Sequence, residues 1–103
     1  ALYPIGGTVG TSLRRLLDAE SIDSQTIAIS GETRENFFVS EASTGHPYRF
    51  ILPGPSFQDA EWQACLSAVA ALRPFPRFVV ASGSLPIGVP DDFYAQVTRI
   101  AKQ

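Results

Sequence analysis

The stretch Arg77-Phe78-Val79-Val80-Ala81-Ser82-Gly83-Ser84-Leu85-Pro86 decides how the rest of the sequence is interpreted. Its apolar first half predicts a buried strand, because the strands of parallel sheets form short apolar runs. The Ser-Gly-Ser turn that follows predicts a loop at the carboxyl end of that strand. In open α/β sheets ligands bind at this end, where glycine lets backbone N–H groups approach an anion. The alternative is that Gly83 and Pro86 only turn the chain toward the next helix, so the surrounding sequence must decide.

Composition limits the kinds of partner that this chain can have. The 103 residues suffice for one modest domain, and only 17% of them are charged. A formal net charge of -2, without any run of Lys or Arg, argues against nucleic acid and anionic membranes as partners. No apolar run reaches the roughly 20 residues of a membrane-spanning helix, and no basic secretory leader is present. We therefore expect a cytoplasmic protein with no membrane and no nucleic-acid partner.

Metal and nucleophile chemistry have little support in the sequence. Cys65 is the single cysteine and falls within an apolar helical pattern, which predicts core packing. His46 is the single histidine and falls at the tip of an expected hairpin, where exposed residues collect. One histidine and one cysteine cannot form a zinc site. The sequence therefore predicts no metal site and no catalytic residue in this chain.

Hydrophobic periodicity predicts an order of strands and helices that defines the fold class. The expected elements are a strand at 1–5, a glycine turn at 6–10, a helix capped by Thr11 or Ser12, a strand at 25–29, strand-like runs at 33–42 and 48–52, a helix after Ser56 to Asp59, the strand described above and a helix beginning at Pro90. Strand–helix–strand connections imply a parallel sheet flanked by helices, and the consecutive middle strands imply a β-hairpin or flap. The expected class is therefore α/β.

The glycine turn Gly6-Gly7-Thr8-Val9-Gly10 could cradle a phosphate, because glycines expose backbone N–H groups. Its spacing matches neither the Walker loop, since no Gly-Lys-Ser/Thr follows, nor the full dinucleotide fingerprint. By itself this turn is only a weak indication of a phosphate-binding site.

Several stretches, in this order, resemble the PfkB family of sugar kinases, which has the ribokinase-like fold. They are residues 1–10, Thr33-Arg34-Glu35-Asn36 and the Ser82-Gly83-Ser84-Leu85-Pro86 loop, and together with residues 48–54 they most resemble the bacterial minor ATP-dependent 6-phosphofructokinase branch. The resemblance implies one partial domain over residues 1–103. Its α/β core would comprise residues 1–24 and 53–103, and lid-like strands would occupy about 25–52.

The resemblance also implies a function for the intact parent protein. It would transfer a phosphoryl group from ATP, with Mg²⁺, to a sugar phosphate, expected to be fructose 6-phosphate; fructose 1-phosphate and tagatose 6-phosphate are the alternatives. Arg34, Ser84 and Gly83 would bind the phosphate of the substrate, since a guanidinium binds phosphate through two parallel hydrogen bonds. The competing interpretation is an exposed arginine paired with Glu32 or Glu35.

The family's remaining motifs are missing from this sequence. It has no Gly-Ala-Gly-Asp segment with the catalytic aspartate, no Asn-x-x-Glu segment for magnesium and nucleotide, and no N-terminal substrate segment. The chain therefore looks like an internal fragment that is inactive by itself and binds neither ATP nor metal. The alternative is a non-catalytic module that binds sugar phosphate weakly or forms a homodimer through its lid-like strands.

Overall fold

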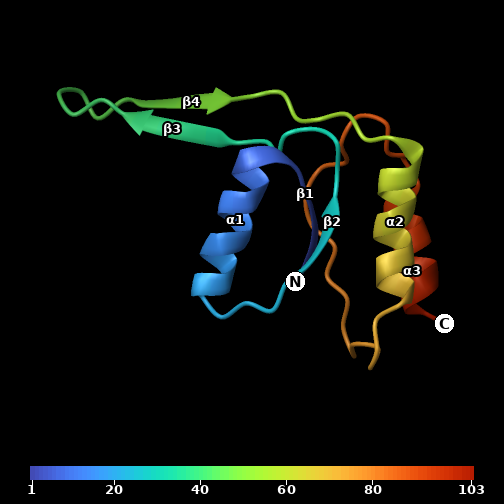
Figure 1. Ribbon diagram of the computed structural model, residues 1–103. Helices are drawn as coiled ribbons and strands as arrows, with labels where there is room; N and C mark the ends of the chain where they lie inside the picture. Colours follow the sequence, from blue (N-terminus) through green and yellow to red (C-terminus); the bar gives the residue numbers. More distant parts are fainter.

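The computed structural model describes all 103 residues and contains two small sheets and three helices. In chain order the elements are β1 (Leu2–Ile5), α1 (Gly7–Ala19), β2 (Gln25–Ala28), β3 (Asn36–Ser40), β4 (Pro47–Ile51), α2 (Asp59–Ala70) and α3 (Phe93–Ala101). Helix α1 lies on one side of the β1–β2 pair, and α2 and α3 lie on the other (Figure 1). This is an α/β arrangement, as the sequence predicts.

Strands β1 and β2 form the parallel sheet of the core, and α1 connects them. Their register runs from Leu2 opposite Gln25 to Ile5 opposite Ala28. The family resemblance places residues 25–28 among the lid-like strands, but the structure pairs them with β1 instead. The physical reason is that a helix joins them, and a strand–helix–strand unit places its two strands parallel in one sheet. The division of the chain into core and lid otherwise stays a prediction.

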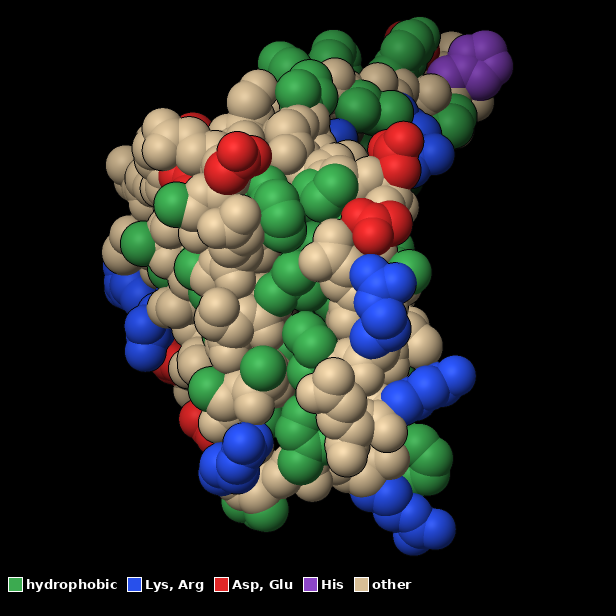
Figure 2. All heavy atoms as spheres, turned by 90° about the vertical axis from the view of Figure 1, so that its right-hand side faces the viewer, with side chains coloured by type: hydrophobic (Ala, Val, Ile, Leu, Met, Phe, Trp, Pro, Cys, Tyr) green, Lys and Arg blue, Asp and Glu red, His purple; other side chains and the backbone are tan.

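Strands β3 and β4 form the predicted hairpin, which projects from the core (Figure 1). The pairing is antiparallel, from Asn36 opposite Ile51 to Ser40 opposite Pro47, and every residue of both strands is exposed. Phe37 and Phe50 stack with ring centroids 4.8 Å apart. His46 lies in the connecting loop, at the end of the projection (Figure 2). The hairpin has no partner layer within this chain.

Helix α1 begins earlier than the sequence predicts. The expected caps were Thr11 or Ser12, but the first helical residue is Gly7, and Gly6 precedes it in an extended conformation. Glycine disfavours helices, so propensity alone hides these first residues. Helix α3 instead begins later than Pro90, at Phe93, because the Pro90 carbonyl accepts the N–H of Phe93 in a turn before the helix.

Helix α2 presents the predicted apolar stripe to the core, where Cys65 is buried. At its N-terminus the Glu61 carboxylate accepts two backbone N–H groups, from Gln58 at 2.8 Å and from Ser30 at 2.6 Å. The first bond belongs to the helix start, and the second joins α2 to the loop that follows β2. Helix α3 packs against α2 and buries Val97.

The prediction of a buried strand over residues 77–81 is wrong. These residues form no strand, and no backbone–backbone hydrogen bond is made by any residue from 73 to 85. Val79 is half-buried, whereas the flanking Phe78 and Val80 are 77% and 89% exposed. Only one face of the segment therefore has a partner layer. A strand with apolar residues on both faces is stable only where both faces are covered.

The bonds made by Glu61 predict how stability depends on pH. The N–H groups of Gln58 and Ser30 hold the pKa of Glu61 below its ordinary value of 4.5. Because folding lowers this pKa, Glu61 stabilises the fold above the ordinary value, and its contribution is lost as the pH falls through the lowered pKa. In Glu61→Gln we expect the free energy of unfolding to fall less between neutral and acidic pH than in the wild type. Urea unfolding at several pH values measures this difference. Parallel curves for the variant and the wild type would contradict the prediction.

Candidate functional site

The carboxyl ends of β1 and β2 meet at the first turn of α1, where the chain segment after β2 is bonded to the glycine turn. Val9 N–H donates to the Glu32 carboxylate at 2.7 Å. Gly6 N–H donates to the Thr33 hydroxyl oxygen, and Thr33 N–H donates back to the Gly6 carbonyl, both at 3.0 Å. Three hydrogen bonds therefore fix the two residues that precede Arg34.

Close packing against this segment explains the glycines of the turn. A Cβ added to Gly7 would lie 1.6 Å from a Glu32 carboxylate oxygen, and one added to Gly6 would lie 1.8 Å from the Gly31 carbonyl. A Cβ on Gly10 would approach the Thr33 hydroxyl to 2.8 Å. Gly7 also has φ +65°, a conformation that favours glycine. The place where a phosphate would bind this turn is thus filled by residues 31–33 of the same chain.

Arg34 is exposed and forms no ion pair. The competing interpretation, in which Glu32 or Glu35 pairs with its guanidinium, finds no support in the structure, because the Glu32 carboxylate bonds to α1 instead. The side-chain stem of Arg34 lies beside Gly54, where an added Cβ would contact it at 3.6 Å. The guanidinium is therefore free to bind an anion.

The Ser-Gly-Ser loop is held by α3. Gly83 has φ +101°, and its carbonyl accepts a 2.5 Å hydrogen bond from the Tyr94 hydroxyl. Ser82 and Ser84 are exposed, and neither hydroxyl has a hydrogen-bond partner in the protein. The loop therefore presents free hydroxyl groups on a backbone that Tyr94 anchors.

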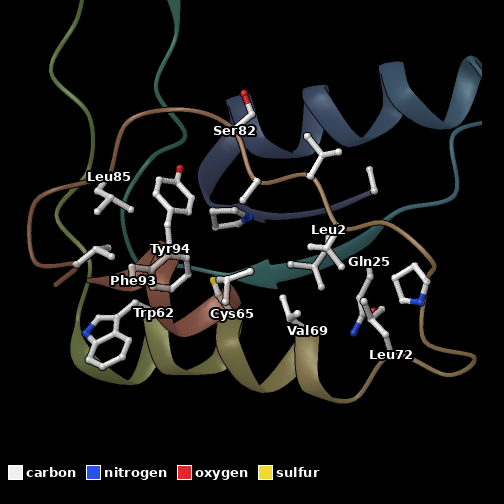
Figure 3. A pocket seen from close by; sticks show the side chains of 18 of the residues that line it. Leu2, Gln25, Trp62, Cys65, Val69, Leu72, Ser82, Leu85, Phe93 and Tyr94 are labelled. Carbon is white, nitrogen blue, oxygen red and sulfur yellow. The ribbon is translucent and has the colours of Figure 1, made fainter. Parts of the chain in front are cut away.

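A cavity of about 820 Å³ lies between this loop, β1 and the facing sides of α2 and α3 (Figure 3). Trp62, Cys65 and Val69 line it from α2, and Ser82 lies on the opposite side, toward α1. Of its 25 lining residues 16 are hydrophobic, and only Asp23 has a charged side chain. A phosphate is bound by cationic side chains and N–H donors, and neither Lys nor Arg lines this cavity.

The three predicted substrate residues do not all line this cavity. Ser84 lines the apolar cavity, whereas Arg34 and Gly83 do not. No sequence motif marks Glu32, Thr33 and Tyr94, which hold the loops. Their partners are 11 to 27 residues away along the chain, and no local pattern encodes such contacts.

The structure offers no set of side chains for a metal. No three His, Cys, Asp or Glu residues lie close enough together to hold an ion. Burial raises the pKa of the Cys65 thiol, which keeps it protonated and unreactive, in agreement with its predicted role in packing. No helix in the structure has the length and apolar character needed to cross a membrane.

No protein-family model matches the sequence. The chain is similar over all of its 103 residues to curated proteins. It is 44% identical to "ATP-dependent 6-phosphofructokinase isozyme 2" of Mycobacterium tuberculosis and 31% identical to "D-tagatose-1-phosphate kinase" of Bacillus licheniformis. The chain spans 30% and 33% of the lengths of these two relatives.

Solved structures agree with these sequence matches. Phosphofructokinase-2 from Escherichia coli, solved as a tetrameric inhibited form and in complex with fructose-6-phosphate, superposes with a TM-score of 0.87 at 31% identity. The match covers 99% of this chain and 33% of that one. The architecture is therefore part of the ribokinase-like fold, and the homologues are sugar-phosphate kinases.

The bond between Tyr94 and Gly83 gives a test of how the loop is anchored. Tyr94→Phe removes only the hydroxyl, and we expect it to lower the free energy of unfolding by about 0.5–1.5 kcal/mol, the net value of one hydrogen bond. Urea unfolding of the full-length protein measures this loss. Tyr48→Phe is the control, because the exposed Tyr48 hydroxyl has no hydrogen-bond partner. Equal stability of the two variants would show that the bond does not hold the loop.

Proposed function

We propose, from the homology of this chain to the PfkB family of sugar-phosphate kinases, that the whole protein transfers a phosphoryl group from ATP to a phosphorylated sugar. The observation that carries the proposal is the Glu32-Thr33 pair, fixed by three hydrogen bonds directly before Arg34, whose guanidinium stays unpaired. A fixed backbone with a free cation suits the binding of a phosphate dianion. The chain alone covers about a third of its relatives, and we propose that it is inactive by itself.

Fructose 6-phosphate is the substrate that we propose. The 44% identical relative carries the name of a 6-phosphofructokinase, and the Escherichia coli structure was solved with fructose-6-phosphate. Fructose 1-phosphate and tagatose 6-phosphate are the alternatives, since other relatives are named "1-phosphofructokinase" and "Tagatose-6-phosphate kinase". All of these share a phosphate ester on a ketohexose.

Three residues of this chain have proposed roles in binding that phosphate. Arg34 would donate two parallel hydrogen bonds to phosphate oxygens, and the Ser84 hydroxyl would add a neutral donor. Gly83, which has a positive φ, would let the backbone approach the anion without steric conflict. For these roles Ser84 and Arg34 would have to face the same ligand. Of the three residues, only Ser84 lines the apolar cavity.

The cofactors belong to the proposal for the whole protein. ATP is proposed because the name of the 44% identical relative includes it. Mg²⁺ is proposed because phosphoryl transfer needs a cation that neutralises the negative charge of the phosphates. The residues present here do not fit a metal site, since no acidic or histidine cluster is formed. The base and the nucleotide contacts would have to come from elsewhere in the protein.

The role of Arg34 can be tested by steady-state kinetics of the full-length protein. We expect Arg34→Ala to raise KM for fructose 6-phosphate by about 10- to 100-fold, the value of a charge-assisted hydrogen bond, with a smaller effect on kcat. Arg15→Ala is the control, since Arg15 is exposed on α1 and unpaired. The same assay with fructose 1-phosphate and tagatose 6-phosphate identifies the preferred sugar. An unchanged KM in Arg34→Ala would remove this residue from the site.

The exposed hairpin supports a second proposal, which is that the protein forms a homodimer through β3 and β4. Phe38, Tyr48 and Ile51 are 64%, 50% and 67% exposed, and the strands present hydrogen-bonding edges. Large apolar side chains gathered on one projection favour burial against another chain. The Escherichia coli relative was solved as a tetramer.

Sedimentation velocity at several concentrations tests this association. We expect the wild type to dissociate only on dilution and Phe38→Asp to shift the equilibrium toward monomer, because a charge would be buried in the interface. Leu16→Asp is the control, since Leu16 is 67% exposed on α1, away from the hairpin. A protein that is monomeric at every concentration would contradict hairpin-mediated pairing.

A further inference from the structure

We propose that Glu32 is a positioning residue for Arg34: its carboxylate, bound to the first turn of α1, fixes the backbone that carries the phosphate-binding guanidinium. This inference rests on the proposed function, in which Arg34 binds the phosphate of the substrate. Neither the sequence motif nor the comparisons assign a role to Glu32.

The geometry gives the carboxylate one clear partner. Glu32 accepts the N–H of Val9 at 2.7 Å, in the first turn of α1, which carries no acidic residue of its own. The first N–H groups of a helix lack partners within the helix and carry partial positive charge. A carboxylate from outside the helix therefore supplies both the missing acceptor and the complementary charge.

The same contact explains why the glycine turn does not hold a substrate phosphate. The Glu32 carboxylate is so close to Gly7 that an added Cβ would lie 1.6 Å from its oxygen. An incoming phosphate would meet a fixed negative charge at this helix end and would be repelled. The anion of the substrate is thus directed away from the turn, toward the free guanidinium.

The hydrogen bond between Val9 and Glu32 also keeps the guanidinium of Arg34 unpaired. Glu32 is the acidic residue two positions before Arg34, and an unanchored carboxylate there would be free to pair with the guanidinium. In the structure the carboxylate is bonded to Val9, and no ion pair involves Arg34. The adjacent Thr33 accepts the N–H of Gly6 on its hydroxyl and donates its own N–H to the Gly6 carbonyl. Both residues before Arg34 are therefore held. Binding of phosphate then needs little reordering of the segment.

The test compares Glu32→Gln with Glu35→Gln in the full-length protein. Both variants remove one negative charge near Arg34, but only Glu32 has a hydrogen-bond partner. We expect Glu32→Gln to raise KM for fructose 6-phosphate about fivefold, with kcat within about twofold, since positioning acts on substrate binding. The inhibition constant of inorganic phosphate should rise in parallel, and Glu35→Gln should leave both constants unchanged.

A double variant tests whether Glu32 acts through Arg34. If it does, Glu32→Gln/Arg34→Ala has the same KM as Arg34→Ala alone, because the two changes remove one interaction. Thermal unfolding is measured alongside. A lower melting temperature with an unchanged KM would show a merely structural role and overturn the inference, as would multiplicative effects in the double variant.

Three further outcomes separate this inference from the proposed function. Tighter binding of phosphate in Glu32→Gln would show that the glycine turn is the anion site and that Glu32 competes with the ligand, which overturns the inference. An unchanged KM in Arg34→Ala would remove the proposed site, and the inference with it. A raised KM in Arg34→Ala with none in Glu32→Gln would overturn the inference alone.

Discussion

The reciprocal hydrogen bonds between Gly6 and Thr33 connect the ends of the two parallel strands, and most of the site depends on them. Both strands end at the same edge of the sheet because they are parallel. The chain continues from β1 as helix α1 and from β2 as an irregular segment with bends at Ser30 and Gly31. A bond between these two continuations keeps the edge of the sheet in one shape. Thr33 makes this junction, and Arg34 is the next residue.

Two acidic side chains secure the segment after β2 from opposite sides of the sheet. Glu61, at the start of α2, accepts the N–H of Ser30, whereas Glu32 reaches the first turn of α1. Each carboxylate is placed at the N-terminus of a helix, where negative charge is favoured. The helices on the two faces are thereby bonded to the same short segment, α2 at Ser30 and α1 at Glu32.

Patterns that are local in the sequence predicted the fold well, whereas contacts between distant segments were missed. The apolar stripe around Cys65 predicted α2, and the Gly45-Pro47 region predicted the hairpin, because periodicity and turn chemistry are local properties. The strand expected at 77–81 failed because a strand also needs a paired neighbour, which the pattern cannot supply. Arg34 and Ser84 were found by resemblance to a family, but the anchoring of Arg34 by Glu32 depends on a contact 23 residues away.

The tight packing of the glycine turn has a consequence for protein engineering. Replacing glycine by alanine commonly stabilises a protein, because it restricts the unfolded chain. At Gly6 and Gly10 the new methyl group would collide with another segment, and at Gly7 the backbone angle adds strain to the collision. This turn therefore offers no position for that strategy. Gly45, at the hairpin tip, has open space around it but a positive φ, so there the obstacle is conformation alone.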